Sequence, residues 1–261
     1  MIKYIKILKC QKFKLRFVLS RLFIKTGILK NFSFFRNTYK IQLNPSSLTL
    51  SMWVNKNERI KEENFICSFL KKGDKVFDVG ANIGTVSLAC AKIVGNTGKV
   101  KSFEPNSKIF QYLKKNIEIN NYSKIIQAHN FGLGSKNKNY KFTEFSDDTS
   151  NTPSDNGKSV ITIKKLDDFI KEKINFLKID VEGFEYEVLK GAKNSLKEIE
   201  FVYFECNRDL LDKHNSSEKM ICDFLKKLNF IVYQVVDYKL KKNMMNNKIS
   251  KMLLAKKQFV N

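Results

Sequence analysis

The sequence predicts an α/β fold in which helices cover both faces of a mostly parallel β-sheet. From residue 58 onward, short apolar runs alternate with longer helical segments. The apolar runs are continuous rather than alternating in polarity, which is typical of strands that are buried on both faces. Acids, amides and glycines follow several of these runs directly, and an open α/β sheet binds its ligand at that point.

The expected elements follow one another in a regular order. The first helix covers residues 58–70, and later helices are expected at 85–94, 108–120, 166–170, 186–196 and 218–228. Strands are expected at 75–79, 100–103, 125–128, 140–145, 160–163, 176–179, 201–204, 231–236 and 249–255. Polar and glycine-containing segments separate these elements, among them a polar turn at 241–248.

The net charge of +22 is concentrated at the two ends of the chain. Residues 1–57 carry 12 Lys and Arg without an acid, and residues 238–261 carry 7 Lys without an acid. Residues 58–237 contain 29 bases and all 26 acids, so the central part is nearly neutral. This balance argues against a catalytic cleft that grips a polyanion. We therefore divide the chain into a basic, partly helical extension, residues 1–57, and a folded domain, residues 58–261.

The N-terminal extension and the cysteines indicate where in the cell the protein is expected. No run of 18 apolar residues occurs, and the N-terminus lacks the uninterrupted apolar core of a signal peptide. The five cysteines form no Cys-x-x-Cys pair, so we expect reduced thiols and no metal site. We expect a cytoplasmic protein whose residues 1–40, with 11 Lys and Arg, either contact the inner face of an anionic membrane peripherally or pack on the domain.

A glycine turn follows the strand expected at 75–79. The segment VFDVGANIG, residues 76–84, takes a strand through Gly80 and Gly84 into a helix. Its glycine spacing differs from both the dinucleotide fingerprint and the phosphate loop. Glu104 lies 20 residues beyond Gly84, at the end of the next strand, where an acid accepts hydrogen bonds from ribose hydroxyls.

These motifs, with SFEPN at 102–106 and FLKIDVEGFEYEVLKGA at 176–192, resemble class I S-adenosylmethionine-dependent methyltransferases, specifically the FkbM family. The resemblance covers about residues 60–237. It implies a Rossmann-like, seven-stranded sheet with an antiparallel last strand, and methyl transfer from S-adenosylmethionine to a hydroxyl, often on a sugar, glycan or small metabolite. The donor-binding residues that it implies are Asp78, Gly80, Ala81, Asn82, Gly84, Glu104 and Asn130. Gly132 stands where the family's Asn-x-Ala-Leu stretch usually has Ala.

Carboxylates at the ends of two further strands are the candidates for chemistry. Asp180 and Glu182 follow the strand at 176–179, and a positioned carboxylate that removes the hydroxyl proton contributes about 10²–10⁴-fold to the rate. Either residue can instead hold the donor's amino group, position the acceptor or bind a metal, and Glu182 can cap the next helix. Glu205 lines the acceptor site or caps the next segment. Glu185 and Glu187 are interpreted as acids that complement a helix dipole.

Two other functions compete with this prediction. The basic charge suggests an RNA methyltransferase, but none of the three prolines, Pro45, Pro105 and Pro153, lies in an Asn/Asp-Pro-Pro-Tyr stretch. The other alternative is a non-catalytic membrane-attached module with a vestigial cofactor site. The intact set of Asp78, Gly80, Gly84 and Glu104 argues against it.

Overall fold

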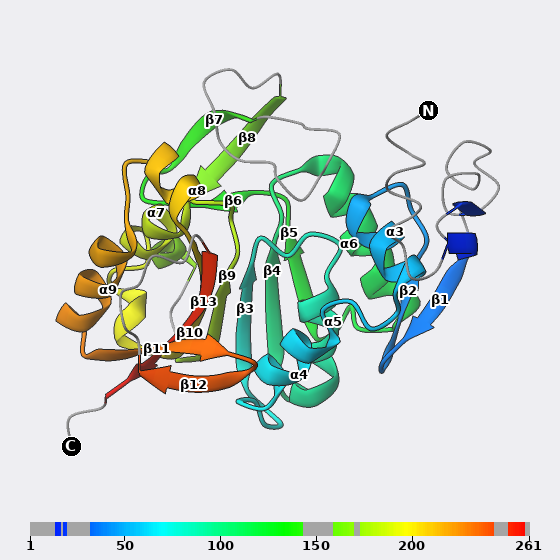
Figure 1. Ribbon diagram of the computed structural model, residues 1–261, viewed down its shortest axis with the longest axis horizontal. Coiled ribbons are helices and arrows are strands. Elements are labelled where there is room, and N and C mark those ends of the chain that lie inside the picture. The colour runs from blue at the N-terminus through cyan, green and yellow to red at the C-terminus, as the bar shows by residue number, and fades with distance from the viewer. Residues whose placement is uncertain are drawn as a thin grey trace.

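The computed structural model describes residues 14–16, 18–19, 32–142, 159–169, 173–242 and 250–258. Its centre is an eight-stranded sheet with the strand order β12-β11-β13-β10-β9-β3-β4-β5 (Figure 1). Five neighbouring strands run parallel: β5 (Ile126–His129), β4 (Lys99–Phe103), β3 (Lys75–Val79), β9 (Ile174–Ile179) and β10 (Ile199–Asn207). The expected mostly parallel sheet is therefore confirmed.

The last strand, β13 (Ser250–Lys257), runs antiparallel between β10 and β11 (Phe230–Val236), as expected. The expected number of seven strands is wrong by one. Residues Lys239–Lys242 form an additional edge strand, β12, which pairs with β11 in a hairpin. This strand overlaps the segment that was expected to be a polar turn. The pattern was misleading because all four side chains of β12 are exposed and its sequence is Lys-Leu-Lys-Lys.

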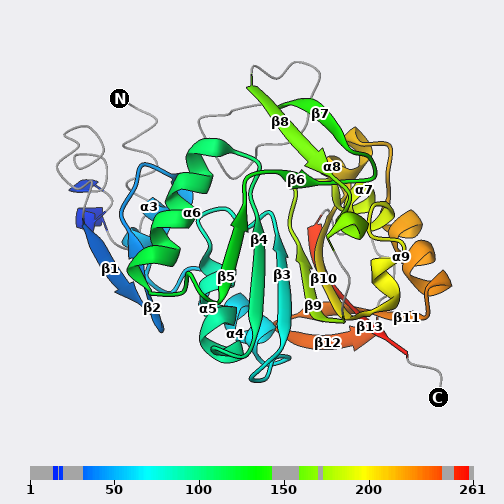
Figure 2. The same cartoon turned by 180° about the vertical axis from the view of Figure 1, so that it is seen from behind.

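Helices cover both faces of the sheet. The first face packs against α4 (Ile60–Cys67), α5 (Thr85–Val94) and α6 (Ser107–Ile119) (Figures 1 and 2). The second face packs against α7 (Glu185–Lys190), α8 (Arg208–Lys213) and α9 (Glu218–Lys227). Neighbouring strand residues alternate between the two cores. Val76 and Phe176 belong to the first, whereas Phe77 and Leu177 belong to the second, which is why both strand sequences are continuously apolar.

Two helical predictions fail in detail. Residues 186–196 do not form one helix, since α7 ends at Lys190 and a 3₁₀ turn follows at Ser195–Lys197. The break lies at Gly191, where a Cβ would be 1.8 Å from the carbonyl oxygen of Gly134, so the chain packs closely against a neighbouring loop. The helix expected at 166–170 is a 3₁₀ turn at Leu166–Asp168.

A small three-stranded sheet lies next to the main sheet. It consists of β6 (Gly132–Leu133), β8 (Ser159–Lys164) and β7 (Lys138–Phe142), and the latter two correspond to the short strands expected in this region. Residues 143–158, which complete the expected loops, lie outside the described residues.

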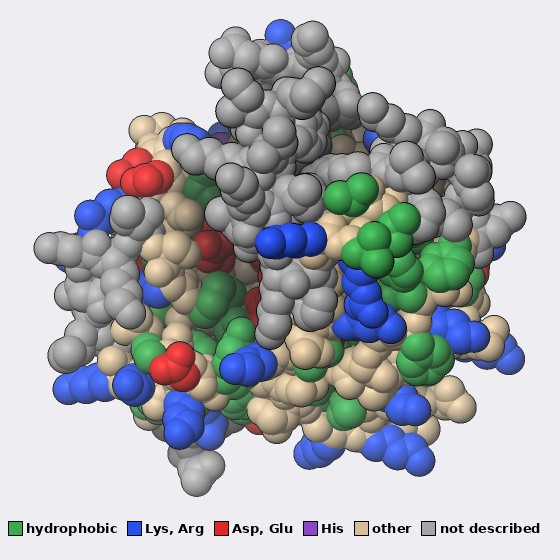
Figure 3. Space-filling view, turned by 45° about the vertical axis from the view of Figure 1, so that its right-hand side comes forward, with side chains coloured by type: hydrophobic (Ala, Val, Ile, Leu, Met, Phe, Trp, Pro, Cys, Tyr) green, Lys and Arg blue, Asp and Glu red, His purple; other side chains and the backbone are tan. Residues whose placement is uncertain are grey.

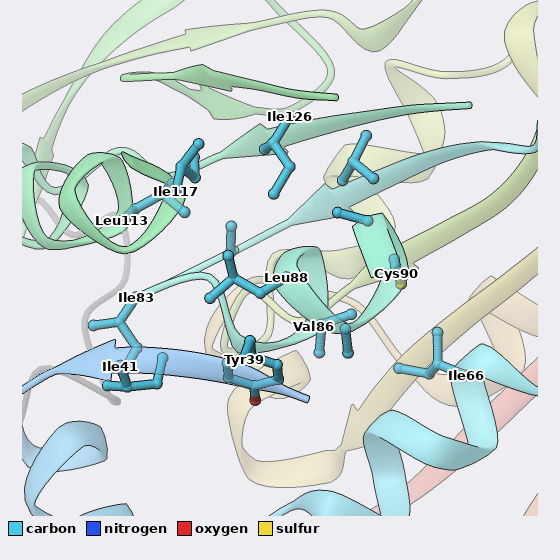
Figure 4. Packing of buried hydrophobic residues seen from close by; sticks show 14 of the residues in the cluster. Tyr39, Ile41, Ile66, Ile83, Val86, Leu88, Cys90, Leu113, Ile117 and Ile126 are labelled. Carbon is cyan, nitrogen blue, oxygen red and sulfur yellow. The ribbon is translucent and has the colours of Figure 1, made fainter. Parts of the chain in front are cut away.

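An N-terminal hairpin packs beside α6. The hairpin consists of β1 (Ser33–Arg36) and β2 (Tyr39–Gln42), and α3 (Ser47–Val54) follows it. Tyr39 and Ile41 enter the same core as Leu88 and Leu113 (Figure 4). Most of residues 1–31 lie outside the described residues, so the proposed domain boundary after residue 57 stays a prediction.

Candidate functional site

The glycine turn after β3 packs directly against the end of β9. Gly80 has a φ of 75°, and a Cβ there would lie 1.9 Å from the carbonyl oxygen of Asp180. The backbone N–H groups of Gly80 and Ala81 both donate to the carbonyl of Phe103, at 3.0 Å. Gly84, with a φ of 92°, is the N-cap residue directly before α5. Only glycine fits this close approach, so Gly80 lets the turn pack directly against the end of β9.

Glu104 is tied to this turn. Its carboxylate accepts hydrogen bonds from the backbone N–H groups of Asn82 at 2.9 Å and Asn106 at 2.8 Å. Burial raises the pKa of Glu104 to about 7, even though these two hydrogen bonds oppose the rise. Glu104 therefore lies beside the glycine turn, as its position at the end of the next strand predicted. Each carboxylate oxygen retains a lone pair that could accept from a ribose hydroxyl.

Asn130 braces the segment that carries Glu104. Its side-chain amide donates to the carbonyls of Glu104 at 2.9 Å and Pro105 at 3.2 Å, and its side-chain oxygen accepts from the Ser107 hydroxyl at 3.0 Å. Asn130 therefore fixes the backbone around Glu104.

Asp78 lies behind the turn rather than in it. Its carboxylate is fully buried, accepts from the Ser87 hydroxyl at 2.5 Å and forms an ion pair with Lys178 at 3.2 Å. Lys178 also donates to the carbonyl of Gly80 at 2.9 Å. Asp78 therefore shapes the turn through Lys178. Lys178 was not among the predicted site residues, although a lysine inside an apolar strand indicates a buried ion pair.

Asp180 lies between two cations. Its carboxylate accepts from the Arg59 guanidinium at 3.2 Å and lies 3.5 Å from the Lys178 ammonium. Burial alone would raise the pKa of Asp180, but Lys178 and Arg59 outweigh it and lower the pKa below its usual value. Asp180 is therefore held as an anion.

Glu182 has the opposite environment. Burial raises the pKa of Glu182 to about 8, and the negative charges of Asp180, Glu205 and Glu185 add to the rise. Its backbone is left-handed, with a φ of 53°. Glu185, not Glu182, satisfies the loop before α7, because it accepts from the backbone N–H groups of Val181 at 3.1 Å and Gly183 at 3.2 Å. The capping alternative considered for Glu182 thus applies to Glu185.

A cavity of about 480 Å³ unites the predicted carboxylates at the ends of β9 and β10. Glu205 lines it and accepts from the Ser250 hydroxyl at 2.7 Å, and burial raises the pKa of Glu205. Acidic side chains lie deep in the hollow of the face shown in Figure 3. The described lining residues are Arg59, Glu62, Asp180, Glu182, Tyr203, Glu205, Val235, Asp237, Tyr238 and Met252.

The cavity combines predicted and unpredicted residues. Asp180 joins it to the glycine turn, so the two halves of the predicted site are neighbours. Arg59, Tyr203 and Asp237 come from the N-terminus of α4, from β10 and from the β11–β12 turn, and no sequence motif marks them. Within the described ranges, no group of three His, Cys, Asp or Glu is arranged to hold a metal ion.

Comparison with known proteins gives the family. A family model described as "Methyltransferase FkbM domain" matches residues 78–232, which is more than half of the 261-residue chain. The chain belongs to the FkbM methyltransferase family. The match includes the glycine turn, Glu104, Asp180, Glu182 and Glu205, whereas Arg59 lies before it.

One curated relative of this FkbM chain is Hexuronic acid methyltransferase AglP from Haloferax volcanii, which is 31% identical over 141 residues. The match covers 52% of this chain and 56% of AglP, so it spans little more than half of that relative's length.

The chain was also compared with solved structures. A Clostridium thermocellum protein designated an rRNA-methylase is 14% identical with a TM-score of 0.50, and the match covers 76% of this chain and 96% of that one. Methyltransferase FkbM from Methylobacillus flagellatus KT is 16% identical with a TM-score of 0.47, over 79% of this chain and 52% of that one. The first similarity shows the fold alone, and it confirms the expected Rossmann-like class I methyltransferase architecture.

Proposed function

We propose that this protein is an S-adenosylmethionine-dependent O-methyltransferase that acts on a hydroxyl of a sugar, glycan or small metabolite. Membership of the FkbM family supports methyl transfer, and the relative named as a hexuronic acid methyltransferase supports a sugar acceptor. The observation that carries the proposal is the contact between Gly80 and Asp180, because it joins the donor-type turn to a carboxylate-lined cavity.

The residues of the turn fit S-adenosylmethionine. Gly80, Ala81, Asn82 and Gly84 would approach it with backbone, and Glu104 would accept hydrogen bonds from its ribose. Each Glu104 carboxylate oxygen accepts one backbone hydrogen bond and keeps a further lone pair, which suits two hydroxyl donors. When bound, the cofactor supplies an electrophilic methyl group on a sulfonium. The chain's own residues must then align the attacking hydroxyl and accept its proton.

We assign the proton transfer to Glu182 and the orienting role to Asp180. Neighbouring titratable groups whose pKa values are pushed in opposite directions take different roles in acid–base chemistry. Asp180 is ionised and engaged by Arg59 and Lys178, so it is a weak base that can orient a hydroxyl. Glu182, with a pKa raised to about 8, is a stronger base once it is ionised. Glu205 would line the acceptor side.

The experiment is a titration with S-adenosylmethionine followed by a transfer screen. The screen offers isotopically labelled methyl donor with sugar nucleotides, glycans and glycolipids, and detects the label in the acceptor. The proposal predicts donor binding and labelling of at least one hydroxyl compound. If the donor binds but only RNA becomes labelled, the proposed acceptor class is wrong. The carboxylate-lined cavity disfavours RNA, since carboxylates repel a phosphodiester backbone.

We also propose a cytoplasmic location with peripheral membrane contact through residues 1–40. The described cysteines, Cys67, Cys90, Cys206 and Cys222, are not in disulfides, which fits a reducing compartment. Among the described residues, no helix is long and apolar enough to cross a bilayer. The 11 Lys and Arg of residues 1–40 support attraction to anionic lipid, at about 1 kcal/mol for each residue near the surface.

Co-sedimentation with anionic vesicles tests the membrane contact. Binding should weaken as salt is added, because the screening length falls to about 8 Å at physiological ionic strength. A variant with Lys3, Lys6, Lys9 and Lys12 replaced by Gln keeps the length of the chain and should bind less. Equal binding of this variant and the unchanged protein contradicts the contact.

A further inference from the structure

Arg59 reaches the proposed catalytic cavity from outside the family-matched segment. It immediately precedes α4, and its side chain lines the cavity with 29% of its surface exposed. Its backbone is left-handed, with a φ of 58°, a conformation that arginine rarely adopts. A conformation of this kind persists where the surrounding contacts hold it in place.

The Arg59 guanidinium has two carboxylate partners. Its Nη2 donates to Asp180 Oδ2 at 3.2 Å, and its Nε donates to Glu62 Oε2 at 2.8 Å. Two bonds from one planar group fix the orientation of that group as well as its position. Arg59 thereby links the start of α4 to the end of β9.

The start of α4 is itself anchored to the N-terminal hairpin. Arg36, at the end of β1, has a fully buried side chain that contacts Glu63 at 2.6 and 2.9 Å and also donates to the carbonyl of Glu58. The Tyr39 hydroxyl donates to Glu63 at 2.9 Å. The residues on both sides of Arg59 are therefore held by β1 and β2.

Asp180 in turn forms the wall between the glycine turn and the cavity. Its backbone carbonyl abuts Gly80, its backbone N–H donates to Val79 at 3.0 Å, and its side chain faces Arg59 and Lys178. A shift of this carboxylate would alter the cavity beside the donor turn. The side chain that meets it from the solvent side is Arg59, since Lys178 is only 3% exposed.

We propose that Arg59 is a positioning residue for the proposed methyl transfer, holding the Asp180 carboxylate beside Lys178 in the wall of the cavity so that Glu182 remains the group that receives the hydroxyl proton. The inference rests on the proposed function. It also assigns a role to the segment before residue 78, because the hairpin β1–β2 anchors the turn of α4 that carries Arg59.

The test uses three variants of the full chain. Arg59→Gln removes the charge, and Arg59→Lys keeps the charge but loses the second hydrogen bond. Lys61→Gln removes an equal charge from an exposed position two residues further on, in α4. Carbon-13 NMR follows the titration of the Asp180 carboxyl, which needs no acceptor. The charged or titratable groups around Asp180 are Lys178, Arg59, Glu62, Asp78, Glu182, Glu185, Tyr203 and Glu205.

The proposal predicts an upward shift of the Asp180 midpoint in Arg59→Gln, a smaller shift in Arg59→Lys and none in Lys61→Gln. A role in packing alone would affect the Lys and Gln variants alike. With an acceptor from the screen, turnover should fall by about 10²-fold in Arg59→Gln, while donor affinity stays within about threefold. An unchanged Asp180 midpoint in folded Arg59→Gln overturns the inference, and so does unchanged turnover.

Failure of the proposed function gives a different result. In that case the unchanged protein binds no S-adenosylmethionine, whereas the Asp180 titration still reports whether Arg59 holds the carboxylate.

Discussion

Gly80 and Asp180 touch through their backbones: a Cβ on Gly80 would lie 1.9 Å from the Asp180 carbonyl oxygen. The two residues are 100 positions apart in the sequence and end neighbouring parallel strands, β3 and β9. This contact joins the turn that would hold the methyl donor to the cavity that would hold the acceptor.

Gly80→Ala should remove donor binding and destabilise the fold. The new methyl group meets backbone, which cannot move aside as a side chain can, so we expect a loss of more than about 4 kcal/mol. Gly73→Ala is the matched control, because Gly73 also has a positive φ but its Cβ would meet only the Thr97 hydroxyl at 3.7 Å. That control should lose about 1–2 kcal/mol. Urea unfolding measures the free energy of unfolding of both variants. Equal losses of stability in Gly80→Ala and Gly73→Ala would contradict the close contact.

Asp180→Asn should separate chemistry from donor binding. The substitution keeps the shape of the side chain but leaves Arg59 and Lys178 facing a neutral amide. Turnover with an acceptor from the screen should fall at least about tenfold, and donor affinity should change by less than about threefold. The exposed substitution Asp212→Asn is the control. Near-normal turnover in Asp180→Asn would contradict the orienting role assigned to Asp180.

Glu182 should make stability depend on pH. Its folded-state pKa of about 8 exceeds the ordinary 4.5, so the folded protein retains a proton that the unfolded chain releases. The stability associated with this group is fully present below pH 4.5 and is lost as the pH rises to about 8. Above that pH, Glu182→Gln should therefore be more stable than the unchanged protein.

Urea unfolding at roughly pH 6 and pH 9 measures the effect, and we expect a gain of about 1–2 kcal/mol for Glu182→Gln at the higher pH relative to the lower. The exposed substitution Glu118→Gln should show no such difference. If both variants behave alike at the two pH values, Glu182 does not have the raised pKa on which the base assignment depends.

The fold was predictable where the sequence pattern has a single physical cause. Residues that alternate between two cores, such as Val76 and Phe77, must both be apolar, so the central strands read as continuous apolar runs. The edge strand β12 has no buried face, and its lysine-rich sequence therefore resembles a turn. The hairpin β1–β2 was missed because Arg36 and Tyr39, a charged and a polar residue, are buried through their contacts with Glu63.

The sequence predicted which residues gather at the site, because the carboxyl ends of parallel strands meet at one edge of the sheet. Asp180, Glu182 and Glu205 meet in one cavity for that reason, and Glu104 lies beside the glycine turn. The directions in which the side chains of Asp78 and Arg59 point could not be predicted from the sequence. Asp78 points into the interior toward Ser87 and Lys178, and Arg59 reaches the cavity from a helix start that no motif marks.

Calorimetric titration with S-adenosylmethionine, performed on the unchanged protein and on Glu104→Ala, tests the central claim most directly. We predict saturable binding to the unchanged protein and a loss of about 1–3 kcal/mol in the variant, because the ribose hydroxyls lose their hydrogen-bond acceptor. Glu118→Ala, an exposed substitution on α6, should bind like the unchanged protein. Equal affinity of Glu104→Ala and the unchanged protein, or no binding by the folded unchanged protein, would contradict the account.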